Sequence, residues 1–129
     1  MSSKENLSQA INQVLNTIRA EKERERIDMN LFATNMIKEF MTMDLPFYSI
    51  AVDPEDKNTV RLQVPFLKDC RVVVEQYLFG SKEKCATLYI NKKAIRKVRL
   101  DDKNAEYMQR VSHALLDYLK RYLILKADF

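Results

Sequence analysis

The sequence predicts one α+β domain over residues 1–129: an N-terminal helix or two helices, a four- to five-stranded antiparallel meander, and a long C-terminal helix packed on the sheet. Three observations lead to this prediction. Apolar residues recur at helical spacing in residues 1–44 and again in 102–126. Between them, in residues 47–100, apolar and polar residues alternate between short turns. At 47% apolar residues, a chain of 129 residues can form one core.

The first helical segment carries four apolar residues at 4-3-4 spacing: Leu7, Ile11, Val14 and Ile18. This spacing puts them on one face of a helix. Residues 19–26 follow with acids and bases three positions apart, which is typical of a solvated helix. So short an apolar stripe is barely long enough to hold a helix by itself, so we expect it to need a surface to lie on.

A second helical segment is expected from Met29 to Met43. Met29, its first apolar residue, comes 11 residues after Ile18, the last apolar residue of the first stripe. Because 11 residues make about three helical turns, the two stripes fit either one continuous helix or two helices. We expect a break at Ile27–Asp28, where Asp28 can cap the second helix. Pro46 ends the helical region, because proline disfavours helical backbone in the residue before it.

Short strands are expected along residues 47–100. The first two are joined by residues 53–58, which contain the proline, aspartate and asparagine typical of a turn. Residues 71–79 have apolar side chains on both faces, which is typical of a central strand. The number of strands is four or five, according to whether residues 94–100 join the sheet. The expected strands are 47–52, 60–64, 71–79, 85–90 and 94–100.

The last helix is expected over residues 103–126, with Asp101 or Asp102 as its cap. Its apolar stripe is unusually wide and includes Tyr118 and Tyr122. A face of this width usually buries against more than one surface, either the sheet plus another helix or a second copy of the chain.

The composition excludes several classes of protein. Gly80 is the only glycine, whereas P-loops and dinucleotide-binding fingerprints need several. No run of 18 apolar residues is present, and the polar start lacks the apolar core of a signal peptide. We therefore expect a cytoplasmic, intracellular chain with no membrane partner. Cys70 and Cys85 are expected to be reduced, small apolar residues, because their spacing matches no ligand or redox motif.

No catalytic or metal-ligating pattern stands out. His113 is the only histidine, and it lies mid-helix beside no obvious serine, cysteine or paired acid, so we expect it at the surface. The three acids of the 53–58 turn are interrupted, and the turn lacks the glycine of a calcium-binding loop. We expect no enzymatic activity, no metal and no cofactor.

The strongest functional signal is a basic stretch, residues 81–100. It holds seven lysines and arginines against one acid, Glu83, a local charge of +6. The whole chain has a net charge of +4, so the remainder sums to −2. If residues 94–100 form a strand, Ala94, Arg96, Val98 and Leu100 share one face, and Ile95, Lys97 and Arg99 share the other.

A two-stranded ribbon with bases along one face and at its turn can follow a phosphate backbone. Tyr89, and Tyr77 or Phe79 in the third strand, would stack on bases if they are exposed. No predicted helix carries the basic face needed to read a major groove, so single-stranded DNA or RNA is the expected partner. The expected contacts are Lys82, Lys84, Tyr89, Lys92, Lys93, Arg96, Lys97 and Arg99.

The sequence leaves other interpretations open. Lysines on an edge strand prevent pairing with other sheets, and an acidic protein partner would also bind a basic patch. The apolar stripes predict a protein-interaction module: an adaptor, an inhibitor or a subunit of a larger complex, with a homodimer as the simplest homo-oligomer. The expected contacts of such a module are Leu7, Ile11, Val14, Ile18, Tyr118 and Tyr122.

Overall fold

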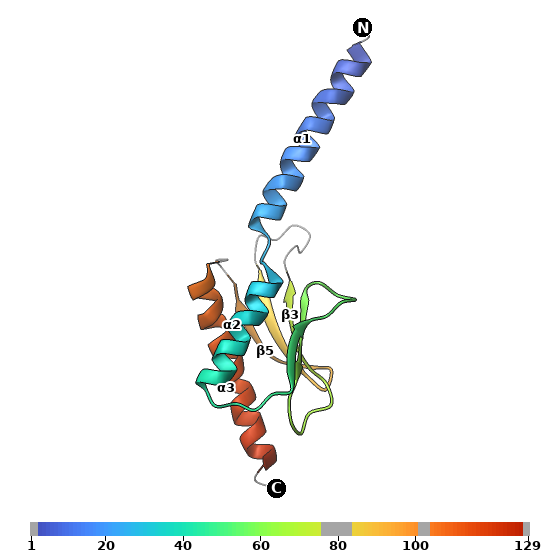
Figure 1. Ribbon diagram of the computed structural model, residues 1–129. Coiled ribbons are helices and arrows are strands. Elements are labelled where there is room, and N and C mark those ends of the chain that lie inside the picture. Colours follow the sequence, from blue (N-terminus) through green and yellow to red (C-terminus); the bar gives the residue numbers. More distant parts are fainter. Residues whose placement is uncertain (1–2, 76–83, 101–103, 128–129) are drawn as a thin grey trace.

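The computed structural model describes residues 3–75, 84–100 and 104–127 and has the predicted α+β architecture. In chain order come α1 (Ser3–Glu25), α2 (Met29–Thr42), five strands and α3 (Ala105–Ala127). Figure 1 shows α1 projecting away from a body in which α2 and α3 lie beside the sheet. Within the described residues, no helix is both long enough and apolar enough to cross a membrane.

The chain breaks between α1 and α2 at the predicted position. Oδ1 of Asp28 accepts hydrogen bonds from the backbone N–H groups of Asn30 and Leu31, at 3.1 and 3.2 Å. These bonds satisfy donors that the first turn of a helix otherwise leaves unpaired. Ile27, just before this cap, is buried in the core. Because α1 contacts no other described helix or strand, Ile27 marks the point where the chain enters the body.

Five antiparallel strands follow one another across the sheet in chain order, which makes the predicted meander. Residues 94–99 join the sheet as part of its fifth strand. Residues 76–79, the predicted end of the third strand, lie outside the described residues. The strands are β1 (Ser49–Val52), β2 (Thr59–Gln63), β3 (Cys70–Glu75), β4 (Cys85–Ile90) and β5 (Lys93–Arg99).

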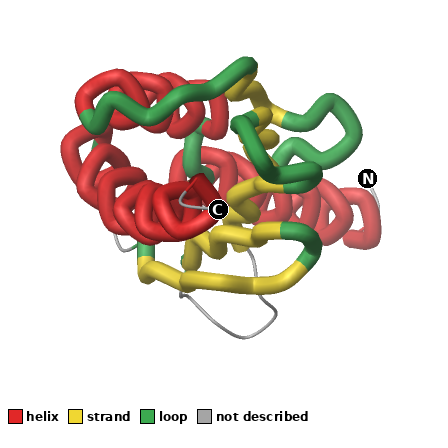
Figure 2. The backbone as a smooth tube through the Cα atoms, turned by 90° about the horizontal axis from the view of Figure 1, so that it is seen from below, coloured by secondary structure: helices red, strands yellow, loops and turns green. Residues whose placement is uncertain are grey.

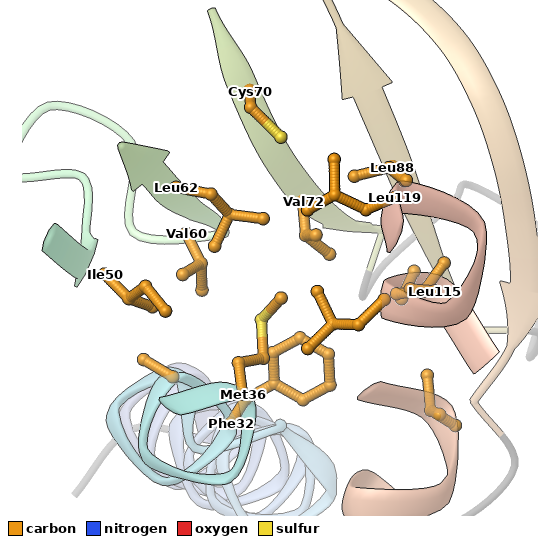
Figure 3. Close-up of a cluster of buried hydrophobic side chains, with 14 of the residues drawn as sticks. Phe32, Met36, Ile50, Val60, Leu62, Cys70, Val72, Leu88, Leu115 and Leu119 are labelled. Atoms are coloured by element: carbon orange, nitrogen blue, oxygen red, sulfur yellow. The ribbon is translucent and has the colours of Figure 1, made fainter. Parts of the chain in front are cut away.

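Helices α2 and α3 cover one side of the sheet, which we call the inner face (Figure 2). α2 lies over β1 and β2, α3 lies over β4 and β5, and the two helices pack against each other. Phe32 and Met36 of α2 meet Leu115 of α3 and Val72 of the central strand in one core (Figure 3). The described residues place no helix over the opposite side of the sheet, which we call the outer face.

α3 begins after Asn104, whose Oδ1 accepts a hydrogen bond from the backbone N–H of Glu106 at 2.9 Å. The predicted caps, Asp101 and Asp102, lie outside the described residues. The wide apolar face of α3 buries against both the sheet and α2, one of the two arrangements predicted for it. Its buried residues are Met108, Val111, Leu115, Leu116, Leu119 and Leu123.

Replacing Phe32, which is fully buried between the layers, should destabilise the fold strongly. We expect Phe32→Ala to lower the free energy of unfolding by about 3–5 kcal/mol, because the ring leaves a cavity in the core. Urea unfolding followed by circular dichroism measures the change. Met41→Ala, at an exposed position of the same helix, is the matched control and should change it by less than about 0.5 kcal/mol. Equal losses in both variants would contradict this packing of α2.

Candidate nucleic-acid interface

β5 divides the predicted basic contacts between the two faces of the sheet. Residues directly opposite each other in an antiparallel pair share a face. Lys97 and Arg99 lie opposite Thr87 and Cys85. These two residues alternate with Ala86 and Leu88 of the core, so both bases lie on the outer face. Arg96 lies opposite the buried core residue Leu88, on the inner-face side.

A β-bulge changes the predicted alternation at the start of β5. Leu88 is opposite Arg96, but Tyr89 is opposite Ala94, so Ile95 has no partner in β4. The prediction that Ala94 shares a face with Arg96 is therefore wrong, because the extra residue moves Ala94 to the outer face beside Tyr89. The prediction that Ile95 shares a face with Lys97 also fails, since Ile95 is half-buried and packs against the core.

Arg96 is held against the helix layer. Its guanidinium carbon lies 5.1 Å from the ring centroid of Tyr118 on α3, a cation–π contact. Lys93 is also on the inner-face side, opposite Ile90, and is exposed. Lys93 therefore lies apart from Tyr89, Lys97 and Arg99, whereas Arg96 lines a shallow hollow together with Tyr89 and Lys97.

Tyr89 lies half-buried on the outer face, directly between Arg71 and Ala94 of the neighbouring strands. The guanidinium carbon of Arg71 is 5.9 Å from the Tyr89 ring centroid. Lys97 lies nearby, with its Nζ 3.8 Å from a carboxylate oxygen of Glu75. Tyr89, Lys97, Glu75 and Ala94 all line one shallow hollow of about 300 Å³. The outer face therefore presents an aromatic ring bordered by two bases.

The remaining predicted contacts lie around the ends of β4 and β5. Lys84, just before β4, is half-buried. Lys82, Tyr77 and Phe79 lie outside the described residues. Lys92 is exposed in the two-residue β4–β5 turn, where its φ is 69°.

A cavity of about 630 Å³ opens at the Lys92 end of the sheet. The β2–β3 pairing ends at Arg61 and Arg71, although β2 continues to Gln63. Residues of both strands beyond that point line the cavity. Its polar lining is Tyr48, Arg61, Gln63, Lys68, Asp69, Arg71 and Lys92.

Sequence reasoning found only Lys92 among the bases of this cavity. Arg61, Lys68 and Arg71 come from two strands and the loop between them, more than 20 residues before Lys92. The alternation in β2 and β3 places Arg61 and Arg71 on the polar face, but only the register brings them together.

A second polar cluster joins α2 to α3. The buried Glu39 carboxylate accepts a hydrogen bond from Nε2 of Gln109 at 2.9 Å, and Nδ1 of His113 lies 3.0 Å from its other oxygen. His113 is exposed, as predicted, but the sequence did not reveal its acidic partner, because helix packing brings Glu39 to it from 74 positions away. The cluster supplies the partners that a buried carboxylate needs. In the described ranges, no three His, Cys, Asp or Glu residues are grouped as metal ligands.

The predicted protein-contact residues of α1 are all exposed. Leu7, Ile11, Val14 and Ile18, together with Leu15, are 42–63% exposed. The surface that this stripe needs is not supplied by any other described element, since α1 contacts none of them. Tyr118 lies under Arg96, and Tyr122 packs against the core, so neither joins the α1 stripe in one surface.

Cys70 and Cys85 are both buried and form no disulfide. Burial, and then the neighbouring carboxylate of Asp69, raise the pKa of the Cys70 thiol to about 12. Since the thiolate is the reactive form, a high pKa lowers reactivity at every pH below about 12.

We expect Cys70 to resist alkylation by iodoacetamide in the native protein at about pH 9, because almost all of its thiol is then protonated. In urea the same cysteine loses its burial and should react at the rate of an ordinary thiol. Peptide mass spectrometry after timed labelling measures both rates. Labelling of Cys70 at equal rates with and without urea would contradict its buried environment.

The outer face thus combines the Tyr89 ring with basic side chains from β3 and β5, and a basic cavity adjoins it. Comparison of this chain with protein-family models, with curated proteins and with solved structures finds no match. Its function is therefore inferred from its own residues.

Proposed function

We propose that this chain binds single-stranded nucleic acid through the outer face of its sheet. The observation that carries the proposal is the group of Tyr89, Arg71 and Lys97, which lie together on a side of the sheet that no described helix covers. Aromatic rings and basic side chains on an open sheet are the components that bind single strands without sequence preference.

Tyr89 is suited to stack on a base. Arg71 lies against its ring from one neighbouring strand, while the other neighbour, Ala94, has only a methyl side chain. A small residue at this position leaves room beside the ring in the shallow hollow. The β5 bulge creates this arrangement, because a regular strand would place Ile95 opposite Tyr89.

Lys97 and Arg99 are suited to contact phosphates. They lie two residues apart on one face of β5, so their side chains follow the strand. The Lys97–Glu75 ion pair spans 3.8 Å between exposed and half-exposed side chains. Such a pair contributes little stability, so Lys97 can exchange its carboxylate partner for a phosphate.

Neutralising these two bases should weaken binding and reduce its salt dependence. We expect Lys97→Gln/Arg99→Gln to make the log–log salt slope less steep by about 0.7 for each phosphate that the protein no longer neutralises. Tyr89→Leu should weaken binding by about tenfold or more at an unchanged slope, because stacking releases no counterions. Fluorescence anisotropy with labelled single-stranded DNA and RNA, at several salt concentrations, measures both quantities.

Arg110→Gln/Arg121→Gln is the matched control, since it removes the same charge from exposed positions of α3. The control should leave affinity nearly unchanged, and thermal melts verify that every variant folds. Equal weakening by control and test variants, or no binding by the wild type at low salt, would reject the outer face as the interface.

One specific observation favours a second function, assembly through α1. Exposed apolar patches of several hundred Å² on a protein mark interaction sites, and the α1 stripe stands on a helix that contacts no other described element. Its 4-3-4 spacing is the heptad spacing of a coiled-coil seam, with Ile11 and Ile18 at one core position and Leu7 and Val14 at the other. A second copy offers the same stripe, so we propose self-association through α1.

Charges placed in the seam should dissociate such an assembly. We expect Ile11→Glu/Val14→Glu to be monomeric under conditions where the wild type forms a dimer, because each buried carboxylate would lack a partner. Light scattering coupled to size-exclusion chromatography measures the mass. Asn12→Glu/Asn16→Glu, on the opposite side of the same helix, is the control and should stay dimeric. A wild type that is monomeric at tens of micromolar would rule out this self-association.

A further inference from the structure

The cavity at the end of β2 and β3 carries a surplus of positive charge. Among the residues that the structure describes, four bases line it, Arg61, Lys68, Arg71 and Lys92, together with one acid, Asp69. Its carboxylate lies 3.8 Å from Nη2 of Arg71 and offsets one of the four positive charges. Four bases around one concave space attract an anion more strongly than the same bases spread over a flat surface.

Two of these bases face each other directly. Arg61 and Arg71 are paired across β2 and β3, on the same face. Like charges at directly opposite positions destabilise a sheet. Arg61 has a carboxylate partner outside the cavity, with Nε 3.1 Å from Asp53, but the 3.8 Å contact of Arg71 with Asp69 is long. An anion between the two guanidinium groups would relieve their repulsion.

Arg71 also has an unused hydrogen-bond donor. Its Nε is buried and has no hydrogen-bond partner among the described residues. A buried donor of this kind needs a partner, and a phosphate oxygen can supply one. Phosphate oxygens pair with a guanidinium through two parallel hydrogen bonds, and such charge-assisted pairs are the strong ones.

Lys92 is held at the cavity by a specific contact between two loops. The backbone N–H of Asn91 donates to the carbonyl oxygen of Asp69 at 2.7 Å, so the β4–β5 turn is fastened to the loop before β3. Asn91 and Lys92 both have positive φ, 51° and 69°, as a two-residue hairpin turn requires. This backbone is unfavourable for lysine, yet it brings a base beside Arg71.

Aromatic side chains lie near the same bases. Tyr48 lines the cavity and is 75% exposed. Phe66, in the loop between lining residues Val64 and Leu67, is 70% exposed and has a φ of 70°. A bulky residue with positive φ is strained, so the loop holds an apolar ring in solvent at a cost in stability. A cavity of about 630 Å³ has room for a phosphate and the nucleoside attached to it.

We infer that this cavity binds the phosphate group of a nucleotide, with Tyr48 available to stack on the base. This inference rests on the proposed function, because the cavity shares Arg71 with the outer face and would anchor one phosphate of a bound strand. A nucleotide supplies the same chemistry whether it is free or part of a strand, so the test separates the two sources.

The experiment is an NMR titration of the full chain, labelled with ¹⁵N, with four probes: inorganic phosphate, adenosine monophosphate, adenosine, and a single-stranded oligonucleotide with or without a 5′-phosphate. We expect the monophosphate to shift the amides of the cavity residues, and adenosine alone to shift them little. Lys68→Gln/Lys92→Gln, at two exposed positions, should weaken monophosphate binding by about tenfold or more. Lys38→Gln/Lys57→Gln is the matched control, because it removes two exposed lysines that do not line the cavity. This control should leave the affinity for the monophosphate unchanged.

The outcomes separate this inference from the proposed function. Oligonucleotide binding that survives Lys68→Gln/Lys92→Gln, with no monophosphate binding in the cavity, overturns the inference and leaves the proposed function intact. If the monophosphate binds in the cavity and the oligonucleotide does not bind, the inference is supported, with a free nucleotide as the ligand of the cavity. The same result rejects the proposed function. Weak chemical-shift changes that spread over the surface, and that are equal in both lysine variants, would show only a general attraction of anions. This result overturns the inference. A 5′-phosphate that strengthens oligonucleotide binding supports a terminal phosphate as the group bound.

Discussion

The packing of one face of the sheet against α2 and α3 determines the rest of this structure. On this inner face, β2, β3 and β4 bury residues such as Leu62, Val72 and Leu88 beneath the two helices. The period of two then sends every intervening side chain to the opposite face. Because a meander pairs each strand with its neighbours in sequence, bases from separate strands meet on that face. The outer face is thus a consequence of how the core is formed.

The elements themselves could be predicted from the sequence, because their signals are local. Asp28 begins α2 through its own side chain, and α2 ends at Thr42, a few residues before Pro46. The bulge at Ile95 could not be predicted, since it depends on where β4 and β5 pair. The opposition of Arg61 and Arg71, and the meeting of Glu39 with His113, likewise depend on register and helix packing. The candidate site was therefore predicted only where it coincides with one continuous basic stretch.

Edge protection explains part of the basic surface. β5 is the last strand of the sheet order, and lysines on such a strand discourage pairing with other sheets. Lys93 and Arg96 fit this role, since they lie along the edge beside the helix layer. Arg61 and Arg71 do not fit it, because they belong to β2 and β3, which are paired on both sides. Asp53 and Asp69 offset part of this charge on the interior strands, and a bound anion would offset more of it.

Self-association through α1 would change how strongly the outer face must bind. Arg61, Arg71 and Lys97 of the outer face each have a carboxylate neighbour, so a single face has only a moderate attraction for phosphate. Two copies joined through α1 would carry two such faces on one particle. When one face holds a strand, binding of the second becomes intramolecular, and the combined affinity can exceed that of either face by orders of magnitude without any new contact. The projection of α1 away from the body (Figure 1) keeps its apolar stripe clear of the sheet, so pairing through α1 and binding at the outer face are compatible.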